Sequence, residues 1–239
     1  MLVIIINLQR SIDRKNYMIS QMNKYQNVNY VFFNAIDGST FTENEIRESY
    51  NENRSLKINK RQLTKTEIAC SMSHRAVYEY ITKNSLKWAC ILEDDVTFRP
   101  ELFKILDYFE NSKFRNIVIK LDQPLGYLAV KKHTKHLFDD IYLNHPYWNS
   151  TSNMGYCIDF EAASNLSRIH KQIFTVSDHW DYFQKIVNVR TVNPQIIQES
   201  SLFKSDIGDR VYIDKKQPKI LRRLMMRIRF LSAYFNYKR

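Results

Sequence analysis

Three consecutive acidic residues, Glu93, Asp94 and Asp95, follow the apolar run W-A-C-I-L at 88–92. Adjacent carboxylates repel one another, and burial raises the cost of keeping them charged. A solvated acidic turn is the simplest interpretation, but a run typical of a buried strand leads directly into these acids. We therefore interpret the triplet as a cation site. On an extended strand Glu93 and Asp95 would share one side, and Asp94 would point to the other.

Carboxylate oxygens suit hard divalent cations, which often take only one or two protein ligands and complete their shell with phosphate and water. The chain has four glycines and contains neither G-x-G-x-x-G nor a P-loop. The sequence therefore contains none of the glycine-rich motifs that bind phosphate through backbone amides. We expect Mn²⁺ or Mg²⁺, held by these acids, to provide the contact with a phosphorylated ligand.

Alternating strand and helix patterns predict an α/β sandwich with a mostly parallel sheet to position these acids. The polar segment 39–62 is expected to be a loop with one short helix. Ser11 is expected to cap the first helix, and Thr64 with Glu67 is expected to form a capping box. The predicted strands are 3–8, 28–35, 88–92, 116–121, 127–131 and 154–160, and the predicted helices are 11–25, 64–81, 101–109, one from 161, and 176–186.

The charge is unevenly distributed along the chain. Of a net charge of +11, residues 215–239 contribute nine Lys or Arg and no acid, which leaves 27 basic and 25 acidic residues elsewhere. A nucleic-acid binder usually spreads its charge over a recognition face, so we expect no nucleic-acid partner. The N-terminus lacks the features of a signal peptide, and no apolar run approaches the ~20 residues of a membrane span.

Three widely spaced cysteines, Cys70, Cys90 and Cys157, make neither a disulfide framework nor a zinc motif by their spacing. This usage fits a protein of the reduced cytosol.

The basic tail is amphipathic. Its apolar stripe comprises Leu221, Leu224, Met225, Ile228, Leu231 and Phe235, and Arg222, Arg223, Arg227 and Arg229 lie mostly off it. Such a helix is typical of a membrane surface with anionic lipid; the alternative is a terminal helix docked on the domain. We therefore divide the chain into a catalytic-type domain, 1–214, and a membrane-association segment, 215–239.

Five motifs occur in order along the first three quarters of the chain. They are V-I-I-I-N-L-Q-R-S-I-D-R (3–14), A-I-D-G (35–38), L-T-K-T-E-I-A-C-S-M-S-H (63–74), I-L-E-D-D-V (91–96) and N-M-G-Y-C-I (153–158). Together they resemble glycosyltransferase family 25, the lipooligosaccharide-biosynthesis glycosyltransferases of Gram-negative bacteria, which are related to the procollagen galactosyltransferases. One departure is Lys65-Thr66, where the family pattern has a Pro-Gly-like pair.

The resemblance implies a GT-A fold, a UDP-sugar donor, most often UDP-galactose, and inversion at the anomeric carbon. It implies that the uridine pocket is lined by Asn7, Leu8, Arg10 and Asp37. Asp95 would be the direct metal ligand, with Glu93 beside it, and Glu93 and Asp94 would hold the ribose, metal-bound water or the sugar. Ser73 and His74 would face the nucleotide; the alternative for His74 is a satisfied, half-buried helix histidine.

An inverting transfer needs a base for the acceptor hydroxyl, and V-S-D-H-W-D-Y-F at 176–183 offers Asp178 and Asp181. The family pattern favours Asp178; the alternative is that Asp178 caps a helix with Asp181 in its first turn. His179 and Trp180 are candidates for the acceptor sugar, although Trp180 suits the core equally well.

Two further segments are open to interpretation. In 142–153, Tyr142, Tyr147 and Trp148 stand among amides and suit a sugar, or their rings pack on the core. In 198–210, Lys204, Ser205 and Asp206 are candidates for phosphate or metal contact, or part of a surface loop.

The sequence therefore predicts an inverting, metal-dependent hexosyltransferase. It would act on a lipooligosaccharide acceptor at the cytoplasmic face of the inner membrane. The alternatives are the same fold with UDP-glucose or a UDP-N-acetylhexosamine, and a non-catalytic sugar- or lipid-binding relative.

Overall fold

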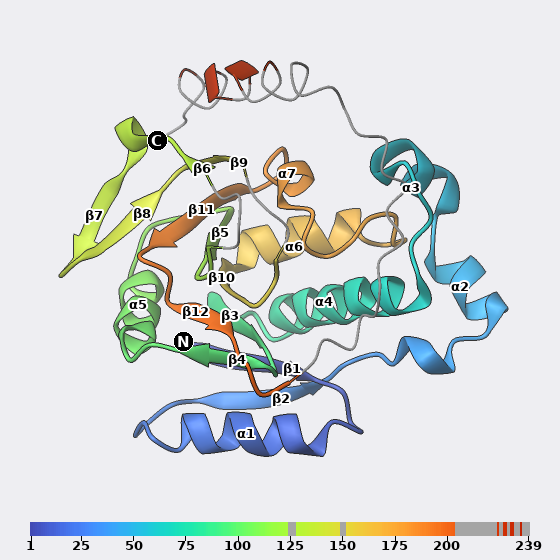
Figure 1. Cartoon of the computed structure of the whole chain (residues 1–239), viewed down its shortest axis with the longest axis horizontal. Coiled ribbons are helices and arrows are strands. Elements are labelled where there is room, and N and C mark those ends of the chain that lie inside the picture. The colour runs from blue at the N-terminus through green and yellow to red at the C-terminus, as the bar shows by residue number, and fades with distance from the viewer. Residues whose placement is uncertain are drawn as a thin grey trace.

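The computed structural model describes residues 1–123, 128–148 and 152–203, and residues 224, 227, 228, 230, 231 and 235 of the tail. Its centre is an eight-stranded sheet in the order β2-β1-β3-β10-β5-β11-β8-β7 (Figure 1). Six of these strands run in one direction, and β10 and β8 run against them. The strands are β1 (Leu2–Asn7), β2 (Tyr30–Asn34), β3 (Trp88–Glu93), β5 (Ile117–Lys120), β7 (Lys135–Phe138), β8 (Ile141–Asn144), β10 (Gly155–Asp159) and β11 (Asn188–Asn193).

Helices cover both faces of the sheet, so its central strands are apolar on both sides. Val3 and Ile5 of β1 pack in a core with α1 (Ile12–Met22) and α5 (Glu101–Glu110). The alternate residues Ile4 and Ile6 pack against α4 (Lys65–Lys83) and α6 (Phe160–Ile169). The expected α/β sandwich is confirmed, with the three layers visible in Figure 1.

The polar segment before α4 holds more structure than the single short helix expected for it. It forms a 3₁₀ turn, η1 (Gly38–Thr40), and two helices, α2 (Glu43–Ser49) and α3 (Glu52–Asn59). Thr42 and Glu45 form a capping box at α2, and the Asn51 side chain caps α3. Helices with few buried residues carry little apolar periodicity, so their caps were the better sequence signal.

The predicted helix at 176–186 is shorter in the structure. Only α7 (Trp180–Phe183) is helical there, and His179, not Asp178, occupies its N-cap position. The turn before it is closed by backbone bonds from His179 to Val176 and from Trp180 to Asp178. This turn is what leaves Asp178 outside the helix.

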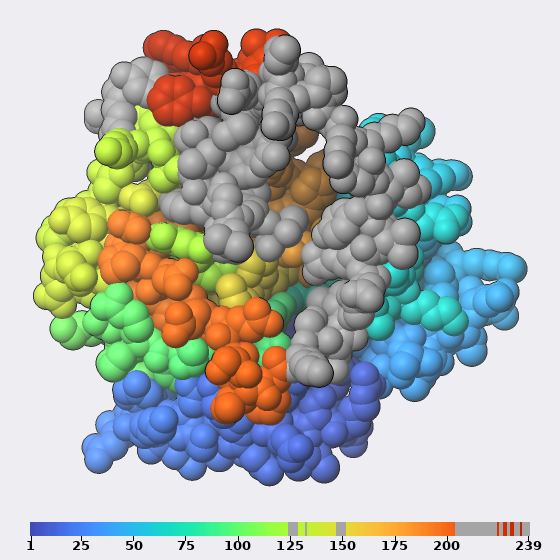
Figure 2. Space-filling view, viewed as in Figure 1, coloured from blue at the N-terminus to red at the C-terminus, as the bar shows by residue number. Residues whose placement is uncertain are grey.

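Smaller elements complete the described part of the chain. β4 (Val96–Phe98) pairs with β12 (Ile197–Glu199), and β6 (Leu128–Ala129) with β9 (Pro146–Trp148), beside the 3₁₀ turn η2 (Lys131–His133). Figure 2 shows residues 188–203, in orange, crossing this face toward α1. The Phe203 ring meets Tyr17 of α1 edge-on, with centroids 5.3 Å apart. Among the described helices, none is both long and apolar enough to cross a membrane.

Candidate active site

A cavity of about 400 Å³ lies at the carboxyl ends of the parallel strands β1, β2 and β3. This end of an α/β sheet is where ligands normally bind, and the volume suits a small molecule. The lining comes from the first half of α4, the loop 35–38, the acidic triplet and residues 152–154 and 176–178, together with Ile6, Leu8, Arg10, Arg14 and Glu199.

The acidic triplet closes β3 and turns into β4. β3 ends at Glu93, so Asp94 and Asp95 lie in a turn. The alternation expected for an extended strand therefore does not hold, and all three acids line the cavity. Asp94 is 7% exposed and accepts hydrogen bonds from Asn7 Nδ2 at 2.6 Å and from Arg14 Nη1 at 3.0 Å. The same Arg14 nitrogen lies 3.0 Å from Asp95 Oδ2.

These contacts give Asn7 and Arg14 roles that the sequence did not indicate. Asn7 is 4% exposed and is not among the described residues that line the cavity; its amide also donates to Ser11 O at 3.1 Å. It positions Asp94, where we had expected it to line a uridine pocket. Arg14, which we had not singled out, neutralises part of the acidic turn. The contact joins residues 80 positions apart, so no local pattern in the sequence could have indicated it.

The charges of the triplet are poorly balanced without a cation. Burial, then the charge of Asp178 and then other nearby acids raise the pKa of Glu93 to about 8. Burial and the charge of Glu93 raise the pKa of Asp95 to about 7, against the opposing effect of Arg14. Crowded carboxylate oxygens with raised pKa values are a donor set that a hard divalent cation fits. Glu93 and Asp95 therefore suit the expected Mn²⁺ or Mg²⁺.

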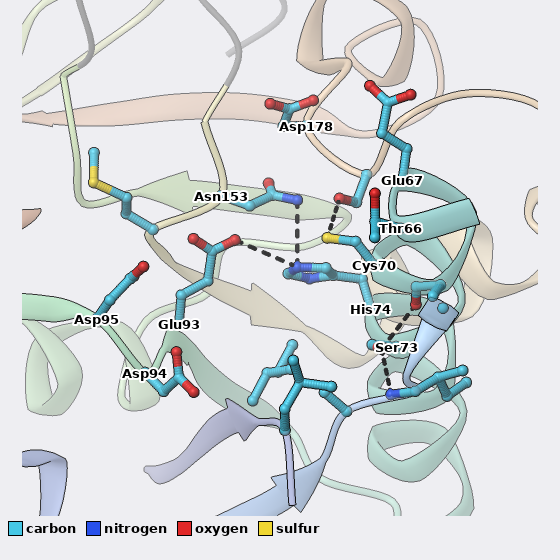
Figure 3. Close-up of a pocket in the computed structure, with 18 of the residues that line it drawn as sticks. Thr66, Glu67, Cys70, Ser73, His74, Glu93, Asp94, Asp95, Asn153 and Asp178 are labelled. Atoms are coloured by element: carbon cyan, nitrogen blue, oxygen red, sulfur yellow. Dashed lines mark hydrogen bonds and ion pairs between the residues drawn. The ribbon is translucent and has the colours of Figure 1, made fainter. Parts of the chain in front are cut away.

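His74 lies at the floor of the cavity, on α4. It is 2% exposed, and its Nδ1 is 2.8 Å from the Tyr156 hydroxyl, which is 2.9 Å from the Tyr78 hydroxyl. Its Nε2 lies 3.9 Å from Glu93 Oε1 (Figure 3). Burial lowers the pKa of His74 to about 4, although the charge of Asp178 opposes this. His74 is therefore a neutral, buried histidine with one ring nitrogen turned toward the cavity.

Ser73 holds the A-I-D-G loop against α4. Its hydroxyl donates to Ala69 O at 2.8 Å and accepts from Ile36 N at 2.8 Å. A Cβ on Gly38 would lie 2.5 Å from Lys65 O, so only glycine allows this approach. Ser73 therefore acts on the loop, although it also lines the cavity.

Arg10 and Asp37 form an ion pair at the rim of the cavity. Asp37 also accepts from Ser39 N at 2.9 Å. The departure at Lys65-Thr66 is accommodated locally, because Thr64 and Glu67 form the expected capping box and start α4. Leu8, also expected at the nucleotide, lines the cavity with this pair.

The two candidate bases lie in different local structures: Asp178 is in the turn before α7, and Asp181 is in α7 itself. Asp178 is 7% exposed and lines the cavity. Asp181 is half-buried on α7 and is not among the described cavity residues. The structure therefore favours Asp178 by position.

The candidate acceptor residues differ in how far they are exposed. Trp180 is 1% exposed, and its ring Nε1 donates to Ser152 O at 2.8 Å, so it belongs to the core and offers almost no surface to a sugar. His179 is half-buried, with Nδ1 2.7 Å from Thr175 Oγ1. Tyr142 is 38% exposed. The side chains of Tyr147 and Trp148 and all of residues 204–206 lie outside the described residues.

The raised pKa values predict that the metal-free protein loses stability as pH rises. In the unfolded chain Glu93 and Asp95 titrate near their ordinary values of 4.5 and 3.8, whereas the folded protein keeps these protons to about pH 8 and 7. Between the pKa of each group in the unfolded chain and its pKa in the folded protein, the folded state binds more protons than the unfolded state. Raising the pH through this range therefore favours unfolding. With a chelator present, we expect the Tm of the wild-type protein to decrease as the pH is raised from 4.5 to 8. The decrease should be smaller in Glu93→Gln.

The matched control is Glu48→Gln, at an exposed glutamate of α2. Its Tm should follow the wild-type pH profile. An equal fall in Glu93→Gln and wild type would contradict the raised pKa of Glu93.

Comparison with known proteins places this geometry in a family. The chain matches the model of glycosyltransferase family 25 (LPS biosynthesis protein) over residues 1–180. Human procollagen galactosyltransferase 2 is 25% identical over 183 residues, which cover 69% of this chain and 27% of that protein. A putative glycosyltransferase, R655, of Acanthamoeba polyphaga mimivirus is 28% identical over 172 residues, 67% of this chain and 50% of that protein.

A glycosyltransferase 25 family member of Aedes aegypti is 28% identical over 101 residues, 41% of this chain and 16% of that protein. The chain thus spans half or less of the length of these relatives. The family model nevertheless covers 180 of the 239 residues, including the acidic triplet and Asp178. The chain belongs to glycosyltransferase family 25.

Proposed function

We propose that this protein is an inverting, metal-dependent glycosyltransferase that moves galactose from UDP-galactose to a sugar hydroxyl. The observation that carries the proposal is the pairing of the acidic turn with a second buried carboxylate, Asp178, in one cavity. Asp178 and Glu93 line the same cavity, and the charge of Asp178 adds to the effect of burial in raising the pKa of Glu93. The relatives named as procollagen galactosyltransferases support galactose as the donor sugar.

The donor would lie along the carboxyl ends of β1 and β3. Asp95 and Glu93 would hold Mn²⁺ or Mg²⁺, which when bound offsets charge on the leaving diphosphate. Leu8 and Arg10, which follow β1, and Asp37, which follows β2, line the same cavity and would contact the uridine.

Asp94 is already oriented by two donors, Asn7 and Arg14. It would accept a hydrogen bond from the ribose without first having to be ordered. Such preorganisation lowers the entropic cost of binding the donor.

Asp178 would act as the general base. It would take the proton from the acceptor hydroxyl as that oxygen attacks the anomeric carbon in line, and the configuration there would invert. His74, with its pKa lowered to about 4, is neutral at working pH and would not compete as an acid. The buried setting of Asp178 strengthens its electrostatic interaction with the reacting atoms.

The acceptor would be a lipooligosaccharide core, met at the inner face of the inner membrane. The tail at 215–239 supports a location at the membrane, because its nine basic residues would be attracted to anionic lipid. Four side chains of its apolar stripe are described, Leu224, Ile228, Leu231 and Phe235, and each is at least half exposed. We expect truncation after Pro218 to reduce binding to anionic vesicles and to leave binding to neutral vesicles unchanged. Equal sedimentation of both proteins with anionic vesicles would contradict this role.

Thermal-shift screening against nucleotide sugars tests the proposed function. UDP-galactose with Mn²⁺ should raise the Tm, because a ligand that binds only the folded state stabilises it. The shift should be smaller without Mn²⁺ and in Asp95→Asn. A larger shift with UDP-glucose or UDP-N-acetylglucosamine would reassign the donor. No shift with any nucleotide sugar would favour a non-catalytic relative.

A further inference from the structure

Three side chains of types that can bind a metal meet in the cavity. Cys70 and His74 are four residues apart on α4, which places them on one face of the helix. Glu93 reaches the same point from the end of β3. One ligand atom from each of the three, a sulfur, a ring nitrogen and a carboxylate oxygen, lies within 4.8 Å of the other two. Figure 3 shows the Glu93 carboxylate to the left of the His74 ring and the Cys70 sulfur just above it.

The three ligand atoms lie slightly farther apart than the ligands of a bound zinc. Zinc ligands lie at about 2.0–2.3 Å from the ion, so neighbouring ligands of a tetrahedral zinc are roughly 3.3–3.8 Å apart. The three atoms lie within 4.8 Å of one another, and His74 Nε2 and Glu93 Oε1 are 3.9 Å apart. Side-chain movements of about 1 Å would therefore bring the three atoms onto one ion.

The surroundings of His74 are those of a metal ligand. Its Nδ1 is held at 2.8 Å by the Tyr156 hydroxyl, which sets the ring with Nε2 directed at Glu93, 3.9 Å away. A metal-bound histidine is usually oriented in this way by a partner on its other nitrogen. The Asn153 amide nitrogen, 3.5 Å from Nε2, is at the outer limit of a hydrogen bond and would turn aside. Cys70 is oriented by Ser177, whose hydroxyl is 3.4 Å from the sulfur.

We propose that Cys70, His74 and Glu93 form a second metal site that takes a thiophilic divalent cation of the zinc class. Thiolate and imidazole select such an ion, whereas the oxygen ligands of Asp95 and Glu93 favour Mn²⁺ or Mg²⁺. Binding forms bonds from zinc to the Cys70 sulfur, the His74 nitrogen and a Glu93 oxygen, and releases to the buffer the thiol proton of Cys70 and the proton held by Glu93. Because Glu93 belongs to both sets, zinc at this site withdraws a ligand from the other metal. Zinc is therefore an inhibitor of the transferase, a consequence that rests on the proposed function; zinc binding itself does not.

Cobalt substitution tests the site without any donor sugar. The full-length, metal-free protein is titrated with Co²⁺, which in a site with a cysteine ligand gives a near-ultraviolet thiolate-to-metal band and visible bands. We expect wild type to show the near-ultraviolet band, saturating at one equivalent and abolished by Zn²⁺. Cys70→Ser should lose the band. The control Cys90→Ala, at a fully buried cysteine of β3, should keep it.

Zinc affinity is then measured by competition with a chromophoric chelator. Tyr156→Phe removes the hydroxyl that contacts both His74 Nδ1 and the Tyr78 hydroxyl, and leaves the three proposed ligands in place. This variant should bind Zn²⁺ about 10- to 100-fold more weakly. Circular dichroism of each metal-free variant checks its fold, and Cys70→Ala replaces Cys70→Ser if that variant does not fold.

Absence of the band in wild type, or its persistence without Cys70, overturns the site. Loss of the band in a folded Cys90→Ala protein overturns it as well. If the band behaves as expected but no transferase activity exists, the zinc site stands and the proposed function fails. Full Mn²⁺-dependent turnover with one zinc bound overturns the shared role of Glu93.

Discussion

Asp178→Asn is expected to lower the rate of sugar transfer by about 100- to 10,000-fold, the usual contribution of a general base. The amide keeps the size of the carboxylate but cannot accept the acceptor proton. Asp178 precedes the N-cap residue of α7, and circular dichroism of the variant checks that its fold is intact. Donor affinity, measured by calorimetry with UDP and Mn²⁺, should change little. The loss should therefore appear in kcat.

Asp181→Asn is the matched control for this change. Asp181 is three residues away, carries the same charge and is not among the described residues of the cavity. We expect nearly wild-type transfer from this variant. A reversed result, with Asp181→Asn inactive and Asp178→Asn active, would move the base to Asp181. Loss of UDP binding in Asp178→Asn would instead indicate a role in holding the donor.

Asp95→Asn should lower metal-dependent turnover by about 100-fold or more, since a bound metal supplies several kcal/mol of charge stabilisation in the transition state. We expect Asp95 rather than Asp94 to bind the metal directly, because Asp94 already accepts hydrogen bonds from Asn7 and Arg14. Excess Mn²⁺ should restore part of the activity if Glu93 retains the ion weakly. Hydrolysis of UDP-galactose over a Mn²⁺ titration measures both effects.

Asp13→Asn removes the same charge from an exposed position on α1 and should have no effect on the Mn²⁺ titration. Turnover of the wild-type protein at an unchanged rate in excess chelator would contradict a metal role for the triplet. Equal losses in Asp13→Asn and Asp95→Asn would show that only net charge matters.

Local pattern was sufficient for much of the fold. The apolar runs that became β1, β3 and β10 are short and bounded by polar residues, and each is buried in the structure. The Thr64–Glu67 capping box was readable because both partners lie within one helical turn. The place of β10 in the sheet could not be predicted from the sequence. It runs antiparallel between β3 and β5, and a buried strand carries no local mark of its direction or neighbour.

The sequence by itself determined the candidate residues for the chemistry: an acidic triplet after a buried strand, and two later acids, Asp178 and Asp181, as candidate bases. The tertiary structure decided which of them meet. Asn7 holds Asp94 across 87 residues of chain, and the turn before α7 directs Asp178 rather than Asp181 into the cavity. Cysteine spacing indicated no zinc motif, yet folding brings Cys70 and His74 beside Glu93. Contacts between distant segments depend on how strands and helices pack, and periodicity within one segment contains no information about its neighbours.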